Sequence, residues 1–276
     1  MLDADGGQLR SDIDAPATLA SLFLGAMRRH DRKAALLQRD GARWRETPDW
    51  RLERQVIRLA LFLKERGALS PGGRVLIVSR LRPELVVAEL AALAQGAAAI
   101  VVDPDETVPY PASQAGAVFV ADPALRGRIG EDPHTLVCFD GAIEGGTAFT
   151  AALDLGGTLD TPERAQSFRS AARAVAPEAK ALGWLAASDR AARFDFITQG
   201  EAMAAVRAEW SAAPPRKDVV AYLAGAATLM ARLGLLAGIG DGRTSCALGD
   251  PAREAADIAE LNPHRILALF SKQQRP

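Results

Sequence analysis

The stretch PGGRVLIVSRLRPELVVAELAALAQGAAAIVVD, residues 71–103, decides the fold. Residues 74–79 and 98–103 are apolar runs rich in β-branched side chains, and between them a helix is expected to begin at Pro83 and end at Gly96. Neither run alternates with polar residues, which is typical of strands buried on both faces. A strand, a helix and a strand in this order predict a right-handed crossover within a parallel sheet.

Upstream of this stretch the sequence predicts a hairpin and a helix. Residues 34–46, AALLQRDGARWRE, form two short extended runs around the tight-turn pair Asp40-Gly41. Thr47 and Pro48 then provide a helix start, and Gly67 a stop. Between them, apolar side chains recur at spacings of three and four, which predicts one buried face: Leu52, Val56, Leu59, Ala60 and Leu63.

Downstream, the alternation of strands and helices continues to the last residues. We expect strands at 116–122 and 134–140, and then a glycine-rich connection with a short helix over residues 141–160. The following elements are a helix opened by Thr161-Pro162, a strand at ALGW, helices near 199–210 and 226–237, strands at DVVAYL, TSCAL and RILALF, and a helix started by Asp250-Pro251. The predicted fold class is α/β, with two layered subdomains, 1–140 and 141–276, whose mostly parallel sheets are flanked by helices.

Composition and charge exclude several classes of function. The chain has 33 Lys+Arg against 34 Asp+Glu, so no basic field favours nucleic acid. Cys138 and Cys246 each lie in an apolar run, as expected of buried, reduced thiols. The start, MLDADGGQLRSDID, is too acidic for a secretory signal, which favours a cytoplasmic location. The apolar window 219–240 contains Arg232, and we therefore expect a buried helix there and no membrane span.

The order of these pieces resembles a known family. TLASLF at 18–23, the helix with Leu59, Ala60 and Leu63, and the passage ALSPGGRVLIVSRLRPELVVAELAALAQGAAAIVVDP are similar to the opening of the acyl-CoA synthetase branch of the adenylate-forming (AMP-binding) superfamily. RLRPE at 80–84 matches that family's helix entry, and Gly96-Ala97 the turn after the helix. ARAVAPEAKALGWLAAS resembles the approach to its phosphate loop, and DIAELNPHRILALF resembles a later helix and strand.

The resemblance implies an ATP-binding loop directly after ALGW, rich in Ser, Thr and Gly and ending in Pro-Lys-Gly. Glycines there let several backbone N–H groups converge on phosphate oxygens, while the lysine adds charge. This chain has AASDRAARFD, residues 186–195, with one hydroxyl, two aspartates and no glycine. Ser188, Arg190 and Arg193 are the candidate anion contacts that remain at this position.

Other features that the resemblance implies are also absent from the sequence. The region AYLAGAATLM has no histidine where the family has a Pro-Leu-x-His segment near its acyl pocket. The family continues beyond a RILALF-like strand to adenine- and ribose-binding motifs and a C-terminal lid domain with a catalytic lysine, and we expect this chain to lack them. His30, His134 and His264 are scattered along the sequence and indicate neither a catalytic dyad nor a metal site.

These observations favour a degenerate, acyl-CoA synthetase-like pseudoenzyme that binds a protein partner, a second copy of itself, or an acyl or carboxylate small molecule. We name no catalytic residue and expect no cofactor; ATP and Mg²⁺ would bind only if this interpretation is wrong. One alternative is half of a split ligase completed by a separate chain. Another is an unrelated small-molecule enzyme on an open α/β sheet, in which Asp103, Asp122 and Asp140 line a crevice, although carboxylates after strands also serve as turn and cap residues.

Overall fold

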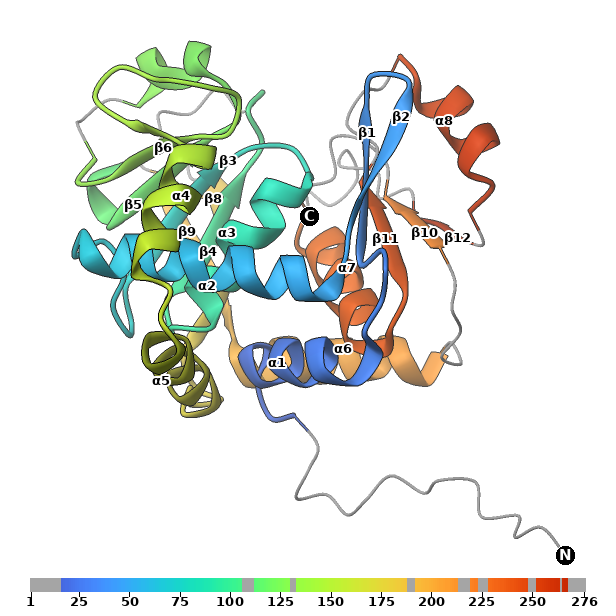
Figure 1. The fold of residues 1–276 in the computed structure, drawn as a ribbon, viewed down its shortest axis with the longest axis horizontal. Coiled ribbons are helices and arrows are strands. Elements are labelled where there is room, and N and C mark those ends of the chain that lie inside the picture. The colour runs from blue at the N-terminus through green and yellow to red at the C-terminus, as the bar shows by residue number, and fades with distance from the viewer. Residues whose placement is uncertain are drawn as a thin grey trace, which may run out of the picture.

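The computed structural model describes residues 16–105, 112–129, 133–187, 192–212, 219–222, 228–247, 252–263 and 265–267. Two sheets with helices packed against them form the fold (Figure 1). The helices are α1 (Leu19–His30), α2 (Asp49–Glu65), α3 (Pro83–Leu93), α4 (Phe149–Leu159), α5 (Pro162–Arg173), α6 (Gln199–Ala212), α7 (Leu229–Asp241) and α8 (Glu254–Leu261). Two short 3₁₀ helices are η1 (Ala112–Gln114) and η2 (Pro123–Arg128).

The larger sheet has seven strands in the order β7-β6-β5-β3-β4-β8-β9. Neighbouring strands are parallel except for β8 and β9, which form an antiparallel pair. β3, α3 and β4 form the crossover that the sequence predicts. The strands are β3 (Arg74–Val78), β4 (Ala98–Val102), β5 (Ala117–Val120), β6 (Leu136–Cys138), β7 (Thr147–Ala148), β8 (Lys180–Ala187) and β9 (Ala192–Thr198).

The smaller sheet joins the two ends of the chain, in the order β12-β10-β11-β1-β2. β1 and β2 form the predicted hairpin, in which Gly41 adopts a φ of 58° at the turn, and β1 pairs in parallel with β11. The remaining strands are parallel to one another. The bounds are β1 (Leu36–Asp40), β2 (Arg43–Thr47), β10 (Val219–Tyr222), β11 (Thr244–Ala247) and β12 (Arg265–Leu267).

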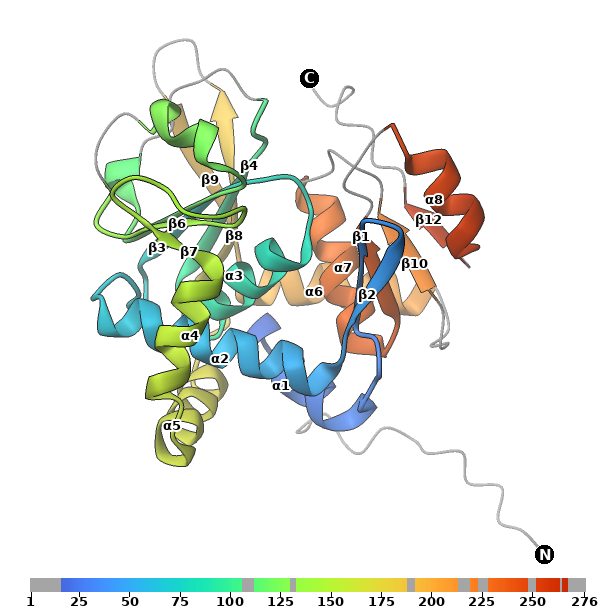
Figure 2. The same cartoon turned by 45° about the horizontal axis from the view of Figure 1, so that its top comes forward.

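Burial explains the shapes of the central helices. In α3 every residue except Glu84 is buried, because this helix lies between the seven-stranded sheet and the rest of the core. α2 buries one face, including Leu52, Leu59 and Leu63, as the spacing predicts. α4 and α5 pack beside α2 (Figures 1 and 2). The opposite face of the large sheet is covered by a separate apolar cluster that includes η1, η2 and Phe194 of β9.

The α/β class with mostly parallel sheets is confirmed, and the structure adds three details. The large sheet runs from residue 74 to 198 and the small sheet takes strands from both ends, so the sheets do not follow the boundary expected at residue 140. α4 makes up most of the connection expected at 141–160. The prediction of a loop over residues 186–195 is wrong in part. Residues 192–198 form β9, and Phe194 of this strand packs into the core.

Candidate functional site at the carboxyl edge of the large sheet

The β8–β9 hairpin occupies the position where the resemblance implies a phosphate loop. Its ladder extends as far as the pair Ala187 and Ala192, so only the four residues 188–191 connect the two strands. Two of the three candidate anion contacts, Ser188 and Arg190, lie outside the described residues. The third, Arg193, lies on β9.

Arg193 points away from the core and is already paired. Its side chain is 74% exposed, and its guanidinium lies 3.1 Å from the Asp195 carboxylate on the same strand. Phe194 and Phe196, which alternate with these two residues, pack on the opposite face of the sheet. A Cβ at Gly183 would lie 2.8 Å from the Phe196 ring, so the glycine in ALGW makes room for an aromatic side chain.

The arginines that follow β3 are paired with carboxylates in the same way. Arg80 lies 2.5 Å from Asp105. Arg82 donates two hydrogen bonds to Asp140, at 2.8 and 2.7 Å, and a third to Glu84 at 2.8 Å. Each of these cations is therefore neutralised by a neighbouring carboxylate, which leaves this edge of the sheet with little positive potential for an added phosphate.

The three aspartates that end strands have structural partners. Asp122 caps η2 by accepting a hydrogen bond from the Ala124 backbone, and Asp140 holds Arg82. Asp103 accepts a hydrogen bond from the Asp105 backbone at 2.9 Å. The interpretation of these carboxylates as turn and cap residues is confirmed for Asp122, and the contacts of the other two agree with it.

The described histidines and cysteines form no reactive arrangement. Nε2 of His30 lies 3.0 Å from the Gly240 carbonyl oxygen, and Nε2 of His134 lies 2.7 Å from that of Arg66, whereas His264 lies outside the described residues. Cys138 and Cys246 are buried free thiols, as expected. Burial raises the pKa of both thiols, that of Cys246 to about 12, so neither is a thiolate at neutral pH.

Among the described residues, no three His, Cys, Asp or Glu side chains gather in a way that could hold a metal ion. Within the same residues, no helix combines the length and the apolar character needed to cross a membrane. The buried helix expected around Arg232 is confirmed: it is α7, in which Arg232 is 1% exposed.

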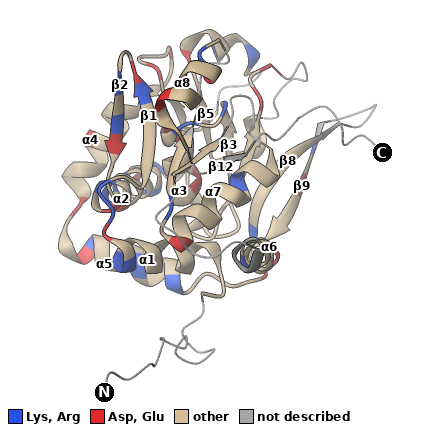
Figure 3. Ribbon diagram, turned by 90° about the vertical axis from the view of Figure 1, so that its right-hand side faces the viewer, with Lys and Arg blue, Asp and Glu red and all other residues tan. Residues whose placement is uncertain are grey.

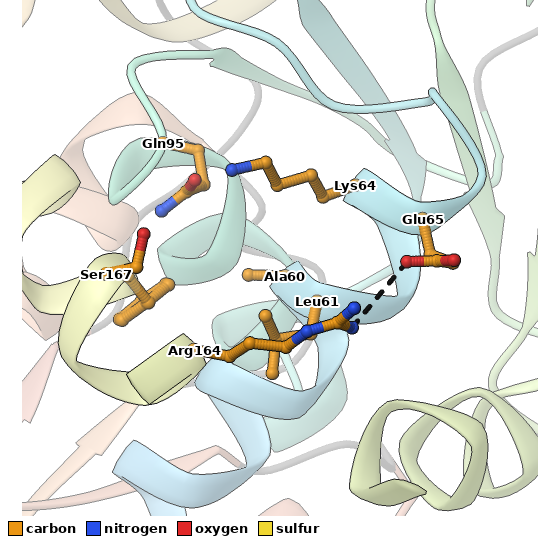
Figure 4. A pocket seen from close by; sticks show the side chains of 8 residues that line it. Ala60, Leu61, Lys64, Glu65, Gln95, Arg164 and Ser167 are labelled. Carbon is orange, nitrogen blue, oxygen red and sulfur yellow. Dashed lines mark ion pairs between the residues drawn. The ribbon is translucent and has the colours of Figure 1, made fainter. Parts of the chain in front are cut away.

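Two cavities lie elsewhere, between helices. The first has a volume of about 430 Å³ and is lined by α2, α5 and the turn after α3. Figure 4 shows Lys64, Gln95 and Ser167 around this space, with Arg164 paired to Glu65 across 3.7 Å at its rim. The second, of about 580 Å³, lies between β2, α2, α4 and the first turn of α3. Arg193 lines neither cavity.

Comparisons with known proteins show which fold this chain shares. No family model matches the chain, and no curated protein matches it significantly. Solved structures of adenylate-forming enzymes do match. One is a Rhodopseudomonas palustris protein assigned as a long-chain-fatty-acid CoA ligase, with a TM-score of 0.70 at 19% identity, covering 92% of this chain and 63% of that one.

Two further matches come from different branches of these enzymes. The fatty acyl-adenylate ligase from L. pneumophila, solved with acyl adenylate and pyrophosphate, gives a TM-score of 0.68 at 11% identity over 92% of this chain. The AMPPNP-bound nonribosomal peptide synthetase FmoA3 gives 0.67 at 18% identity over 94%. The chain spans only 44% and 25% of these two proteins. At these identities the matches show the fold: that of the N-terminal part of adenylate-forming ligases, as the resemblance predicts.

Sequence reasoning missed the partners of the edge arginines and both cavities. The RLRPE motif was visible, but Asp140 is 58 residues from Arg82, and only the parallel pairing of β3, β5 and β6 brings the two together. The second cavity had one visible signal. Arginines recur along α2 at spacings of three and four, which places Arg51, Arg54 and Arg58 on one face of the helix.

Proposed function

We propose that this chain is an acyl-CoA ligase-like pseudoenzyme: it keeps the scaffold of an adenylate-forming enzyme but does not form adenylates, and it acts by binding a protein partner or an acyl-type ligand. The scaffold is shared with ligases that include one solved with acyl adenylate. The absence of adenylation and the binding role are our inference from the edge of the large sheet.

The observation that carries the proposal is the short connection between β8 and β9. Four residues, Ser-Asp-Arg-Ala, join strands that pair up to Ala187 and Ala192. A triphosphate cradle requires several backbone N–H groups that converge on the same oxygens, and glycines usually supply that backbone freedom. A four-residue connection with no glycine and no lysine lacks the residue types that usually build such a cradle. The sequence of this connection therefore does not fit ATP in the way that the fold implies.

Electrostatics supports the same conclusion. Adenylation places developing charge on phosphate oxygens, and positioned cations that stabilise this charge usually make the largest catalytic contribution. At this edge Arg80, Arg82 and Arg193 are each held by carboxylates. To contact a phosphate they would first have to break an existing ion pair, and the released carboxylate would repel the ligand.

The test is calorimetric titration of the purified chain with ATP and Mg²⁺, in parallel with the Arg193→Ala variant. We expect no ATP binding by either chain. Micromolar ATP binding by the native chain would contradict the proposal, and a loss of that binding in Arg193→Ala would locate the site at the hairpin.

The partner in this proposal is either a second copy of the chain or another protein. Exposed large apolar side chains lie on three helices: Trp50 on α2, Leu155 on α4 and Met230 on α7. Apolar side chains at a surface favour association when they lie in one patch. Light scattering over a range of concentrations checks the self-association arm, and a monomer at the highest concentration would exclude the homodimer.

A further inference from the structure

We propose a second ligand site in the cavity of about 580 Å³ between β2, α2, α4 and the first turn of α3, which we call the α2–α4 groove. Its ligand class is a small molecule in which an aromatic ring carries a phosphate group. The volume lies within the range of about 300–1,000 Å³ that is typical of small-molecule sites. The inference does not depend on the argument about the β8–β9 hairpin, because neither β8 nor β9 contributes a lining residue.

Arginine side chains form one wall of the groove. Arg51, Arg54 and Arg58 lie on α2 at spacings of three and four residues, so they project from the same face of the helix. Arg45 reaches the same cavity from β2. β2, α2 and α4 lie on one side of the molecule in Figure 3, where the basic positions of β2 are visible. Guanidinium groups are planar donors that suit phosphate oxygens.

The positive charge of this wall is only partly neutralised. Arg54 and Arg58 share one carboxylate, Asp160, at 3.4 Å each. Within the described part of the chain, the Arg51 side chain has no ion pair or hydrogen bond. The lining includes four arginines and two acidic residues, Glu84 and Asp154.

Arg45 is likewise left with part of a carboxylate. It lies 3.3 Å from Glu84, which also accepts a hydrogen bond from Arg82 at 2.8 Å. Even with Asp160 included, four arginines face three carboxylates. This excess of guanidinium groups contrasts with the carboxyl edge of the sheet, where each described ion pair already gives an arginine its own acidic partner.

An exposed aromatic ring lies beside this positive wall. Trp50 precedes Arg51 on α2, lines the groove and is 61% exposed, which is unusual for a large apolar side chain. Val87 and Leu153 extend the apolar surface from α3 and α4. An indole face stacks well on a second aromatic ring. Trp50 and Arg54 are four residues apart on one helix face, and Arg51 lines the same groove. A ring stacked on Trp50 would therefore carry an attached phosphate into a cavity lined by guanidinium groups, and this combination selects the ligand class.

The test measures binding of 1-naphthyl phosphate by calorimetry at neutral pH, with uncharged 1-naphthol as the matched compound. We expect the phosphate to bind and the naphthol to bind much more weakly. Arg51→Ala should lower the affinity about tenfold, because it removes a charge-assisted contact. Trp50→Ala should lower it by a similar factor. Both side chains are exposed and away from the core, and thermal unfolding confirms that the variants fold.

Two controls make the result decisive. Arg164→Ala removes another exposed arginine, from the rim of the other cavity, and we expect it to leave the affinity unchanged. Arg51→Lys keeps the charge but not the planar donors, and we expect an intermediate affinity. The proposal is overturned if 1-naphthyl phosphate does not bind, if Arg51→Ala binds it as well as the native chain, or if 1-naphthol binds equally tightly. Binding at the β8–β9 hairpin would instead survive Arg51→Ala, which separates this test from that of the proposed function.

Discussion

Two arginine–carboxylate pairs in this chain differ in almost every respect except their chemistry. Arg232 and Glu89 are 1% and 4% exposed and lie 2.6 Å apart. Arg193 and Asp195 are 74% and 37% exposed and lie 3.1 Å apart. The first pair lies in the centre of the scaffold, and the second at the position where the resemblance implies an anion site.

The buried pair joins two helices, α3 and α7, to the large sheet. Besides Glu89 of α3, Arg232 of α7 donates to the carbonyl oxygens of Gly183 on β8 at 2.8 Å and Ala99 on β4 at 2.7 Å. Burial raises the pKa of Glu89, and the charge and hydrogen bond of Arg232 oppose that rise. The contrast teaches that the chain uses a buried arginine with three hydrogen-bond partners to hold its framework. Among the described residues, the arginine at the implied phosphate position is bound only by its strand neighbour Asp195.

The largest effect should come from breaking the buried pair. Arg232→Met leaves Glu89 buried without its cation and two carbonyl oxygens without donors, so we expect a loss of about 3–5 kcal/mol in the free energy of unfolding. Urea denaturation measures it. Replacing both partners, Arg232→Met with Glu89→Leu, should recover part of that loss, because no unpaired charge remains. A single variant as stable as the native chain would show that the pair does not hold the framework.

A second framework contact should give a smaller loss. A Cβ at Gly156 of α4 would lie 2.0 Å from the Arg58 carbonyl oxygen of α2, so Gly156→Ala must push these helices apart, at a cost of about 1–3 kcal/mol. Gly157→Ala is the matched control. Its Cβ would meet only the Arg58 side chain, at 3.3 Å, and that side chain can move. Equal effects of the two substitutions on the melting temperature would contradict the close approach of α2 and α4.

A smaller, pH-dependent effect is expected at His30, where α1 meets the end of α7. Burial lowers the pKa of His30 below its usual 6.5, although its contact with the Gly240 carbonyl opposes this. The unfolded chain therefore binds a proton more readily, and the stability present above pH 6.5 declines as the pH falls toward the folded-state pKa. His30→Gln should flatten this part of the stability profile in urea titrations. Identical curves of stability against pH for the native chain and His30→Gln would contradict this prediction.

The exposed pair should give the smallest effect. Arg193→Ala removes a solvent-screened pair at an exposed strand edge, and we expect a change within about 0.5 kcal/mol. Thermal unfolding in parallel with Arg232→Met measures the contrast directly. If Arg193→Ala lowered the free energy of unfolding as much as Arg232→Met, the exposed pair would stabilise the fold as strongly as the buried pair, which would contradict the comparison.

The sequence predicted the central fold well because its signals are local. Uninterrupted apolar runs at 74–79 and 98–103 with a helix between them allow few alternatives, and Asp40-Gly41 defines a hairpin by turn chemistry. β9 was missed for a related reason. Residues 192–198, ARFDFIT, alternate as an edge strand does, but charged residues flank Phe194, and the expectation of a loop at this position outweighed the alternation.

The site could be predicted only in part, because its properties depend on partners far apart in sequence. Ser188, Arg190 and Arg193 followed from a position within the resemblance, but the number of residues between β8 and β9 depends on how far their pairing extends. The α2–α4 groove draws on four elements, and its charge balance depends on Asp160, about 100 residues from the arginines it holds. Sequence patterns over a few neighbouring residues do not predict contacts between residues this far apart.

The most direct test of the central claim is a pyrophosphate-release assay with the purified chain, ATP, Mg²⁺ and a panel of fatty and aromatic acids. The account predicts no release above the protein-free blank for any acid, because the described edge offers neither converging amides nor unpaired cations for a triphosphate. Pyrophosphate release that depends on both the chain and the acid would contradict it.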